Sequence, residues 1–336
     1  MRLQLQPNQP KGSATYRAHT NIALIKYWGK RDQALFLPVT SSLSLTLDAF
    51  YTDTQVTFDA QLAHDRFILD GQEQEASQVA KVSAFLDRFR ALAQTDCRAL
   101  VTSTNHVPTA AGLASSASAY AALACATNAA LGLDLSQRQL SILARQGSGS
   151  ASRSLFGGFV IWHAGQGEDS DSSYAEPFEA ADWDLAMLVV MVNKGTKKIS
   201  SRQGMALTME TSPFYALWPD EVAKDLAAIQ PAILAHDLDR VGQIAEHNAM
   251  KMHATMIAAN PSFSYWEAAS LKAMDLVRQL RQEGFTAYFT MDAGPNVKVL
   301  CPASQAEAIR DRFMTVFDSK QLAVAYPGPA PYPIND

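Results

Sequence analysis

The first hundred residues alternate hydrophobic and polar positions in the manner of β-strands. Leu43–Leu47 and Thr54–Asp59 each place an apolar side chain at every second position, which predicts two half-buried strands. Phe67–Leu69 runs directly into Asp70-Gly71, a dipeptide typical of tight hairpin turns. Leu100–Ser103 predicts a further strand that ends in a loop. We therefore expect the N-terminal half to open with several strands.

Elsewhere, hydrophobic residues recur at helical spacing. Two of the predicted helices begin with a capping box, in which a Ser and a Gln or Glu three positions later satisfy free backbone N–H groups. These are Ser136–Gln146 and a last helix that follows Ser304–Glu307, with an apolar stripe of Ile309, Phe313 and Val316. The other predicted helices are Val79–Phe89, Ser116–Leu131, Pro213–Ile229, Leu238–Met256 and Ser264–Gln282.

The remaining segments give a mixed pattern. Gly158–Trp162 and Leu185–Val192 have the length and content of strands, and Phe285–Thr290 and Val297–Cys301 predict paired strands joined by a tight turn. Gly165–Glu179 is acidic and rich in Ser and Gly, which predicts a surface loop close to a domain boundary. Because strands and helices do not alternate strictly, the pattern favours an α+β fold over a doubly wound sheet.

Length adds a prediction of domain number. At about 150 residues per domain, a chain of 336 residues is expected to form two domains. We place them at residues 1–182 and 183–336. The Pro-rich tail, YPGPAPYPIND, is expected to be extended and mobile.

Composition excludes several classes of protein. Hydrophobic residues make up 48% of the chain and charged residues 18%, ordinary values for a soluble globular protein. The 28 Lys and Arg are outnumbered by 33 Asp and Glu, so we expect no nucleic-acid or membrane partner. Three distant cysteines predict neither a disulfide framework nor a zinc ribbon. Ala117–Leu133 is too weakly hydrophobic to span a bilayer, and the first residues lack a signal-peptide core, so we expect a cytoplasmic protein.

Pro108–Ser116 has the composition of a phosphate-binding loop. Its small residues and single glycine let backbone N–H groups turn toward an anion, and the next helix offers the positive end of its dipole. Ser115 or Ser116 could bond a phosphate or its magnesium ion. An ordinary Ser-capped helix explains the segment equally well. No Walker A loop occurs and Gly147–Ser152 lacks the third Rossmann glycine, so nucleotide binding would need another scaffold.

Asn21–Arg31 interleaves cations and aromatic residues in a run apolar enough to be buried. Lys26, Lys30 and Arg31 alternate here with Tyr27 and Trp28. An unpaired buried charge is costly, so inward cations need an anionic partner such as a substrate phosphate or carboxylate. Each lysine alone is explained better by a snorkelling side chain at a strand edge, but three cations together weaken that interpretation.

Two further segments carry charged residues among turn formers. Gly147–Ser154 surrounds Arg153 with glycines and hydroxyls, where a guanidinium could grip a carboxylate or phosphate; the alternative is a flexible linker. Met291–Asn296 holds Asp292 before Gly-Pro-Asn, and on the residues alone Asp292 is better explained as a turn former. The histidines show no ligand spacing, and we expect core or surface roles for them.

Taken together, these motifs resemble a known family. Pro108–Ser116 is similar to the phosphate loop of the GHMP kinase superfamily. With Asn21–Asp32, Gly147–Arg153, Ser200–Met205 and Met291–Asn296, it resembles the diphosphomevalonate decarboxylase family in its bacterial form, over about residues 15–317. The resemblance implies a GHMP kinase fold of the α+β class. A ribosomal-S5-like N-terminal half would carry phosphate loop 108–116, and a ferredoxin-like C-terminal half would complete the active site in the cleft between them.

The resemblance also implies a reaction. The tertiary 3-hydroxyl of mevalonate 5-diphosphate would receive the γ-phosphoryl group of ATP with Mg²⁺, after which phosphate and carbon dioxide leave and isopentenyl diphosphate forms. Asp292 would be the base that faces the 3-hydroxyl, and Arg153 would hold the C1 carboxylate. No tightly bound cofactor is expected, nor a metal site beyond Mg-ATP. A homodimer is usual in the family.

Further residues are assigned by position in the motifs. The implied substrate-binding residues are Asn21, Lys26, Tyr27, Lys30, Ser148, Ser150, Arg153 and Ser201. The implied ATP-binding residues are Ser103, Asn105, Pro108, Gly112, Leu113, Ala114, Ser115 and Ser116.

Two other functions compete with this one. A related kinase could phosphorylate a 3-hydroxyl or another small alcohol without decarboxylation, but it would need no arginine clamp for a carboxylate. A catalytically silent relative could merely sense a phosphorylated metabolite, but the intact Asp292 disfavours it.

Overall fold

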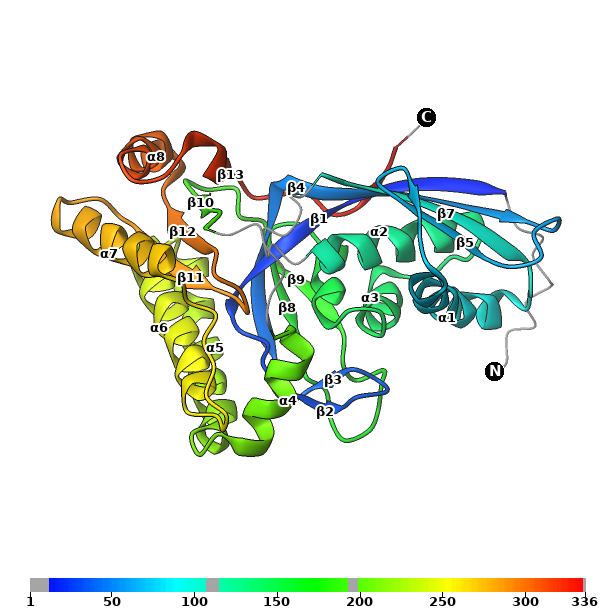
Figure 1. The fold of residues 1–336 in the computed structure, drawn as a ribbon, viewed down its shortest axis with the longest axis horizontal. Helices are drawn as coiled ribbons and strands as arrows, with labels where there is room; N and C mark the ends of the chain where they lie inside the picture. Colours follow the sequence, from blue (N-terminus) through cyan, green and yellow to red (C-terminus); the bar gives the residue numbers. More distant parts are fainter. Residues whose placement is uncertain (1–11, 107–114, 193–198, 335–336) are drawn as a thin grey trace.

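The computed structural model describes residues 12–106, 115–192 and 199–334 of the chain. Within these residues, the strands form one large sheet in the N-terminal half, a smaller one in the C-terminal half and a two-stranded hairpin (Figure 1). The strands are β1 (Ser13–Ile25), β2 (Lys30–Asp32), β3 (Leu37–Pro38), β4 (Ser42–Asp59), β5 (Arg66–Leu69), β6 (Gln72–Glu73), β7 (Arg98–His106), β8 (Phe159–Trp162), β9 (Ala175–Glu179), β10 (Ala186–Val190), β11 (Tyr288–Met291), β12 (Val297–Cys301), β13 (Leu322–Ala325) and β14 (Tyr332–Pro333).

The large sheet is built around two long antiparallel strands, β1 and β4. Its order is β14-β1-β4-β7-β5-β6, and β8 and β9 extend it beside the first residues of β4. Leu43–Leu47 and Thr54–Asp59 therefore belong to one continuous strand rather than two. The small sheet is antiparallel in the order β11-β12-β10-β13, so β12 lies between two neighbours.

Helices cover the sheets. Figure 1 shows α1, α2 and α3 together on one side of the large sheet; α6, α7 and α8 pack against the small one, and α5 lies along α6. In the parts of the chain that the structure describes, no helix is both long and apolar enough to cross a membrane. The helices are α1 (Ala76–Ala93), α2 (Ser115–Ala130), α3 (Gln137–Arg145), α4 (Ser201–Thr211), α5 (Trp218–Leu234), α6 (Leu238–Ile257), α7 (Ala268–Gln282) and α8 (Ala306–Met314), with short 3₁₀ helices at Gly149–Leu155, Tyr215–Leu217, Ala303–Gln305 and Ser319–Gln321.

One apolar core joins the two halves of the chain. Ile22 and Leu45 of the large sheet belong to the same buried cluster as Met187 of β10 and Val241 of α6. The last residues of β1 are fully buried at this junction. The shared core fixes the end of β1 against the C-terminal half, and the residues that follow β1 carry the candidate site.

Capping boxes decide where α3 and α4 begin, but not where α8 begins. The box predicted at Ser136 is confirmed, with both of its hydrogen bonds to Gln139 present. The box predicted at Ser304–Glu307 is wrong, because the Ser304 hydroxyl donates to Asp184 instead and α8 begins at Ala306. A box between Ser200 and Gln203 starts α4, a helix that the hydrophobic spacing did not indicate.

Two other boundaries differ from the prediction. The helix predicted over Pro213–Ile229 begins only at Trp218, after the 3₁₀ turn at Tyr215–Leu217, and continues to Leu234. Gly165–Glu179 is not a loop throughout, because its last five residues form β9 and pair with β8. Acidic and Ser-rich composition concealed a short edge strand.

The tail is extended, as predicted, but it is anchored rather than mobile. Leu47 forms a bridge with Pro327, the N–H of Gly328 donates to the carbonyl of Thr46 at 2.8 Å, and β14 pairs with β1. A Cβ added at Gly328 would lie 2.6 Å from the Leu47 carbonyl carbon, so only glycine allows this close approach. Residues 326–334 thus return from the small sheet to the large one.

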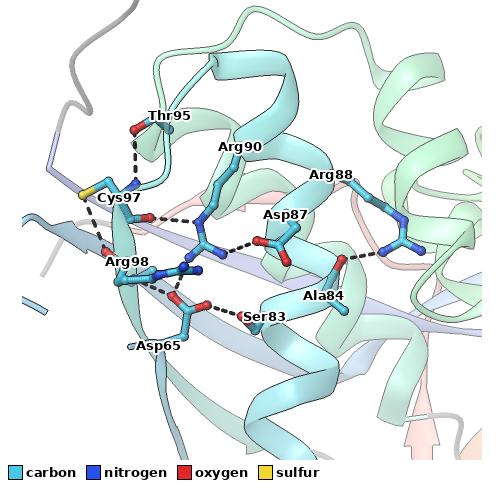
Figure 2. Close-up of polar contacts among 10 residues, drawn as sticks. Asp65, Ser83, Ala84, Asp87, Arg88, Arg90, Thr95, Cys97 and Arg98 are labelled. Carbon is cyan, nitrogen blue, oxygen red and sulfur yellow. Dashed lines mark hydrogen bonds and ion pairs between the residues drawn. The ribbon is translucent and has the colours of Figure 1, made fainter. Parts of the chain in front are cut away.

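A buried ion pair ties α1 to the outer strands of the large sheet (Figure 2). Asp65 accepts hydrogen bonds from Ser83, from Arg90 and from the backbone N–H of Ala99. Burial opposes ionisation of Asp65, but these donors outweigh it and hold the pKa of the carboxyl below its ordinary value. The cluster stabilises the edge of the N-terminal half and lies apart from the residues described next.

Candidate active site

Asp292 lies in the turn between β11 and β12 and does two things there. Its carbonyl accepts the turn hydrogen bond from Gly294 at 2.7 Å, as a turn former should. Its carboxylate is held between two lysines: Lys26 Nζ is 2.8 Å from Oδ1 and Lys298 Nζ is 3.0 Å from Oδ2. Lys26 follows β1, so this contact joins the two halves of the chain. Explaining Asp292 by turn chemistry alone is therefore insufficient.

Burial and charge set the protonation states in this cluster. The Lys26 and Lys298 side chains are 2% and 0% exposed, whereas 27% of the Asp292 side chain is open. Burial disfavours the Asp292 anion, but the two ammonium groups outweigh it and hold the pKa of the carboxyl far below its usual range. Burial lowers the pKa of Lys26 to about 8 despite the attraction of Asp292. Near neutral pH, Asp292 is ionised and Lys26 is charged.

Arg153 is fixed by a network of its own. The 3₁₀ helix Gly149–Leu155 buries it beside β1, where its Nε donates to Asn21 Oδ1 at 3.1 Å and its Nη1 to the Ser42 hydroxyl. Asn21 in turn donates to the carbonyl of Ser150 and to the hydroxyl of Ser154. Burial lowers the pKa of Arg153 only to about 10, and Asp292 opposes that shift, so the guanidinium stays charged. A flexible linker is excluded here.

A second group of cations gathers around Phe36. Lys30 Nζ lies 3.6 Å from the Phe36 ring centroid, and the Arg202 guanidinium lies 5.4 Å from it. Burial and the neighbouring Arg202 lower the pKa of Lys30 to about 8. Tyr27 packs on Trp162 close by, and burial raises the pKa of its hydroxyl above the ordinary value. Lys30 and Arg202 thus lie close together although their like charges repel. Such an arrangement suits the binding of an anion with several charges.

Arg31 does not belong to this group. The sequence predicted it as a third inward cation beside Lys26 and Lys30, but its side chain is exposed and donates to the carbonyls of Gly167 and Pro38. Those bonds fasten the β2–β3 hairpin to the loop before β9. The arginine therefore supports the hairpin that carries Lys30.

The predicted serines cluster at the start of α2. The hydroxyls of Ser116 and Ser148 are 3.1 Å apart, and Ser148 is 3.4 Å from Ser150. Ser115 and Ser116 are exposed in the first turn of α2. The first turn of α2 and the segment that carries Arg153 thus lie side by side. Pro108, Gly112, Leu113 and Ala114 lie outside the described residues.

The other predicted binding residues are less exposed than Ser115 and Ser116. The Ser103 hydroxyl pairs with Thr54 within the large sheet, and Asn105 accepts from Thr52 near the end of β7. Thr52 also contacts Ser118 of α2, so the end of β7 lies against the first turns of that helix. Ser201 is half-buried in the first turn of α4.

Three residues of the site were missed by sequence reasoning. Lys298 supports Asp292, Arg202 faces Phe36, and Asn248 of α6 accepts a hydrogen bond from the backbone N–H of Lys26 at 2.8 Å. Lys298 could have been found from the sequence, because it is the one charged residue in the otherwise apolar strand Val297–Cys301. Arg202 lies inside a motif but was passed over. Nothing in the sequence marks Asn248.

Protein side chains alone do not form a metal centre here. Among the described residues, no three His, Cys, Asp or Glu side chains lie close enough together to hold an ion. His253, beside the Asp292 cluster, is buried, and burial with the nearby Lys26 charge lowers its pKa to about 3. It is a neutral core residue rather than a ligand.

Comparison with known proteins identifies the family. The family model for the diphosphomevalonate decarboxylase-like N-terminal domain matches residues 18–175, and that for the mevalonate 5-diphosphate decarboxylase C-terminal domain matches residues 187–329. The chain belongs to the diphosphomevalonate decarboxylase family. The human diphosphomevalonate decarboxylase is 36% identical over 312 residues, which cover 87% of this chain and 77% of the human one.

Solved structures of the family share the whole fold. The mevalonate diphosphate decarboxylase of Staphylococcus aureus has a TM-score of 0.93 at 47% identity, covering 96% of this chain and 98% of that one. MDDEF, solved in complex with MVAPP, AMPPCP and magnesium, has a TM-score of 0.91 at 52% identity, covering 97% and 99%. The predicted GHMP kinase fold is confirmed, and so is the resemblance to the decarboxylase family.

Proposed function

We propose that this chain catalyses the ATP-dependent decarboxylation of mevalonate 5-diphosphate to isopentenyl diphosphate, ADP, phosphate and carbon dioxide, a step of the mevalonate pathway. One observation carries the proposal: an ionised carboxylate, Asp292, is held by lysines from both halves of the chain, near a charged and rigid Arg153. A kinase that only transfers a phosphoryl group needs no arginine to hold a carboxylate. A decarboxylase must hold the carboxylate that leaves.

Asp292 faces the 3-hydroxyl in this proposal. An alcohol is far too weak an acid for an ordinary aspartate to deprotonate outright, and Asp292 is a weaker base still. In a loose phosphoryl-transfer transition state the nucleophile needs little activation, so Asp292 orients the hydroxyl and takes its proton late. Its two oxygens offer about four acceptor sites, of which the lysines use two, so acceptors remain for the substrate.

The same carboxylate serves the second half of the reaction. Loss of phosphate from the tertiary carbon leaves positive character at C3, and expulsion of carbon dioxide quenches it. A fixed anion beside C3 stabilises that charge without reorganising. Arg153 keeps the C1 carboxylate aligned for departure and takes no part in proton transfer, because a guanidinium stays charged.

The diphosphate and the nucleotide take the remaining predicted residues. Lys30, Tyr27 and Ser148 hold the diphosphate, with Asn21, Lys26, Ser150 and Ser201 around it. ATP lies along α2 with its phosphates on Ala114, Ser115 and Ser116, and Ser103 and Asn105 lie by the nucleoside. The helix N-terminus supplies free N–H groups for the phosphates, and Mg²⁺ arrives with ATP. The complex of MDDEF with MVAPP, AMPPCP and magnesium supports this pairing of substrates.

The proposal also covers the domain boundaries, the cellular location and the oligomeric state of the protein. The N-terminal domain comprises residues 1–182 with phosphate loop 108–116, and the C-terminal domain residues 183–336. The enzyme is a homodimer, as the family resemblance suggests, and it is cytoplasmic, as its few and scattered cysteines suggest. Sedimentation of the purified protein tests the dimer: a monomeric mass at micromolar concentration contradicts it.

Product stoichiometry tests the reaction. With Mg-ATP and mevalonate 5-diphosphate, we expect ADP, free phosphate and carbon dioxide in equal amounts. ADP without phosphate or carbon dioxide would instead identify a kinase that stops after phosphorylation. No ADP at all would mean a different substrate or a silent relative.

A further inference from the structure

Lys298 occupies a position where a lysine is costly. It lies within β12, a fully buried strand with β11 on one side and β10 on the other, and its side chain is 0% exposed. The neighbouring residues Val297 and Val299 are also buried and apolar. Lysine is almost never fully buried without a compensating partner, so the contacts of its ammonium group should explain its presence.

Those contacts lead to Asp292. Lys298 Nζ is 3.0 Å from Asp292 Oδ2 and 3.4 Å from the carbonyl of Asn296, so it spans the turn from which Asp292 projects. Lys26 holds the other carboxylate oxygen at 2.8 Å and is itself fixed by the Ala23 carbonyl. With one ammonium on each oxygen, the carboxylate cannot rotate without losing a charged hydrogen bond.

Stability alone does not account for the second lysine. Lys26 already satisfies the charge of Asp292, and Arg153 adds a third buried cation that interacts with the same carboxylate. Three cations around one anion repel one another in a buried site, where such repulsion is weakly screened. A group that strains the site electrostatically while fixing a reacting side chain fits a functional role better than a structural one.

We propose that Lys298 is a positioning residue, which holds Oδ2 of Asp292 so that the open part of the carboxylate faces the reacting hydroxyl of the substrate. The inference rests on the proposed role of Asp292. Lys298 itself is fully buried against the carboxylate, and in this proposal it makes no contact of its own with the substrate. It acts on turnover through Asp292 and has no part in holding the diphosphate or the nucleotide.

The first test separates turnover from binding. In Lys298→Met, which suits an apolar strand and leaves Asp292 paired with Lys26, we expect kcat to fall about a hundredfold, the typical cost of a misplaced reacting group. The KM for mevalonate 5-diphosphate should stay within about threefold, since the binding groups are untouched. Lys298→Gln, which keeps a donor without the charge, should recover part of kcat. Lys272→Met, on the exposed face of α7, is the matched control with unchanged kinetics.

A double-mutant cycle with Asp292→Asn then decides whether Lys298 acts through Asp292. Single-turnover release of labelled carbon dioxide should show no further loss when Lys298→Met is added to Asp292→Asn. The inference would be overturned if Lys298→Met reduced turnover by the same factor in the wild-type enzyme and in Asp292→Asn. An unchanged kcat in both Lys298→Met and Lys298→Gln would overturn it as well. Near-normal turnover in Asp292→Asn alone would instead overturn the proposed role of Asp292, so the two failures are distinguishable.

Discussion

The acid–base properties of single residues set what this site can do. Asp292 is held ionised by two lysines, whereas Lys26 and Lys30 are buried enough to have pKa values of about 8. The site therefore has an anion that persists to low pH and cations that lose their protons at mildly alkaline pH. Binding of a diphosphate reverses the second effect, because an anion next to a lysine stabilises its charged form.

Proton uptake measures this coupling. At pH 8.5, free Lys30 is largely neutral and bound Lys30 is charged, so binding of mevalonate 5-diphosphate should take up protons. Isothermal titration calorimetry in two buffers of different ionisation enthalpy gives the number of protons taken up for each substrate molecule that binds. We expect Lys30→Met to reduce the uptake and Lys272→Met to leave it unchanged; equal uptake in Lys30→Met and wild type would show that Lys30 does not meet the diphosphate.

Arg153 should matter for binding and turnover together. Arg153→Ala removes a charged grip on the substrate carboxylate, worth about 1.5–3 kcal/mol, so kcat/KM should fall by roughly ten- to a hundredfold or more. Arg153→Lys keeps the charge but loses the planar fork, and recovers only part of the activity. Steady-state kinetics and thermal melting are measured together. If only the melting temperature changed, Arg153 would be a structural residue held by Asn21 and Ser42.

At the scale of elements, the candidate site depends on short segments between the sheets. The β2–β3 hairpin carries Lys30 and Phe36. Arg145, at the end of α3, fixes this hairpin through a hydrogen bond to the carbonyl of Leu35. The fully buried Arg145 donates to the carbonyls of Leu35, Ser170 and Ser173. Within the described residues this buried cation bonds only neutral acceptors, and it ties the β2–β3 hairpin and the loop before β9 to the end of α3.

Removal of Arg145 should therefore loosen the hairpin. In Arg145→Met we expect a several-fold rise in the KM for mevalonate 5-diphosphate and faster proteolysis within residues 30–38, because the carbonyls lose a charged donor. Arg138→Met is the control: Arg138 lies on the same helix but is exposed and packs over Tyr174. An unchanged KM together with unchanged proteolysis would contradict the positioning of Lys30 by this anchor.

Elements were predictable where a local pattern decides them. The capping box at Ser136 is a local hydrogen-bond motif and was confirmed, and α4 could have been found from Ser200 and Gln203 in the same way. The box at Ser304 failed because a distant residue, Asp184, competes for the hydroxyl. In the site, the motifs located Asp292 and Arg153, but the contacts with Lys298 and Asn248 arise from packing that separates partners by many residues along the chain.

At the scale of the whole molecule, the two halves are not independent. They share one apolar core, the Lys26–Asp292 pair joins them, and the tail returns from the small sheet to the large one. The tail was predicted to be mobile because Pro-rich composition indicates an extended chain but not what it packs against. We expect the protein to unfold in a single transition, since neither half can bury the end of β1 alone.

Gly328 tests the contribution of the tail. In Gly328→Ala the new Cβ would clash with the backbone of Leu47, which should lower the free energy of unfolding by about 1–3 kcal/mol. Pro329→Ala changes the exposed neighbouring residue without such a clash, and should lower the free energy of unfolding by less. Chemical denaturation followed by circular dichroism measures both. Equal stability of Gly328→Ala and wild type would mean that the tail does not contribute to the fold.

The most direct measurement of the whole account is the kinetics of Asp292→Asn. The change keeps the shape of the side chain but removes the anion that orients the 3-hydroxyl and stabilises charge at C3. We predict a fall in kcat of at least about a thousandfold with the Kd for mevalonate 5-diphosphate nearly unchanged, as expected for a group that acts in the transition state. Turnover near the wild-type rate in a folded Asp292→Asn enzyme would contradict the account, and would reduce Asp292 to an ion pair between the two halves.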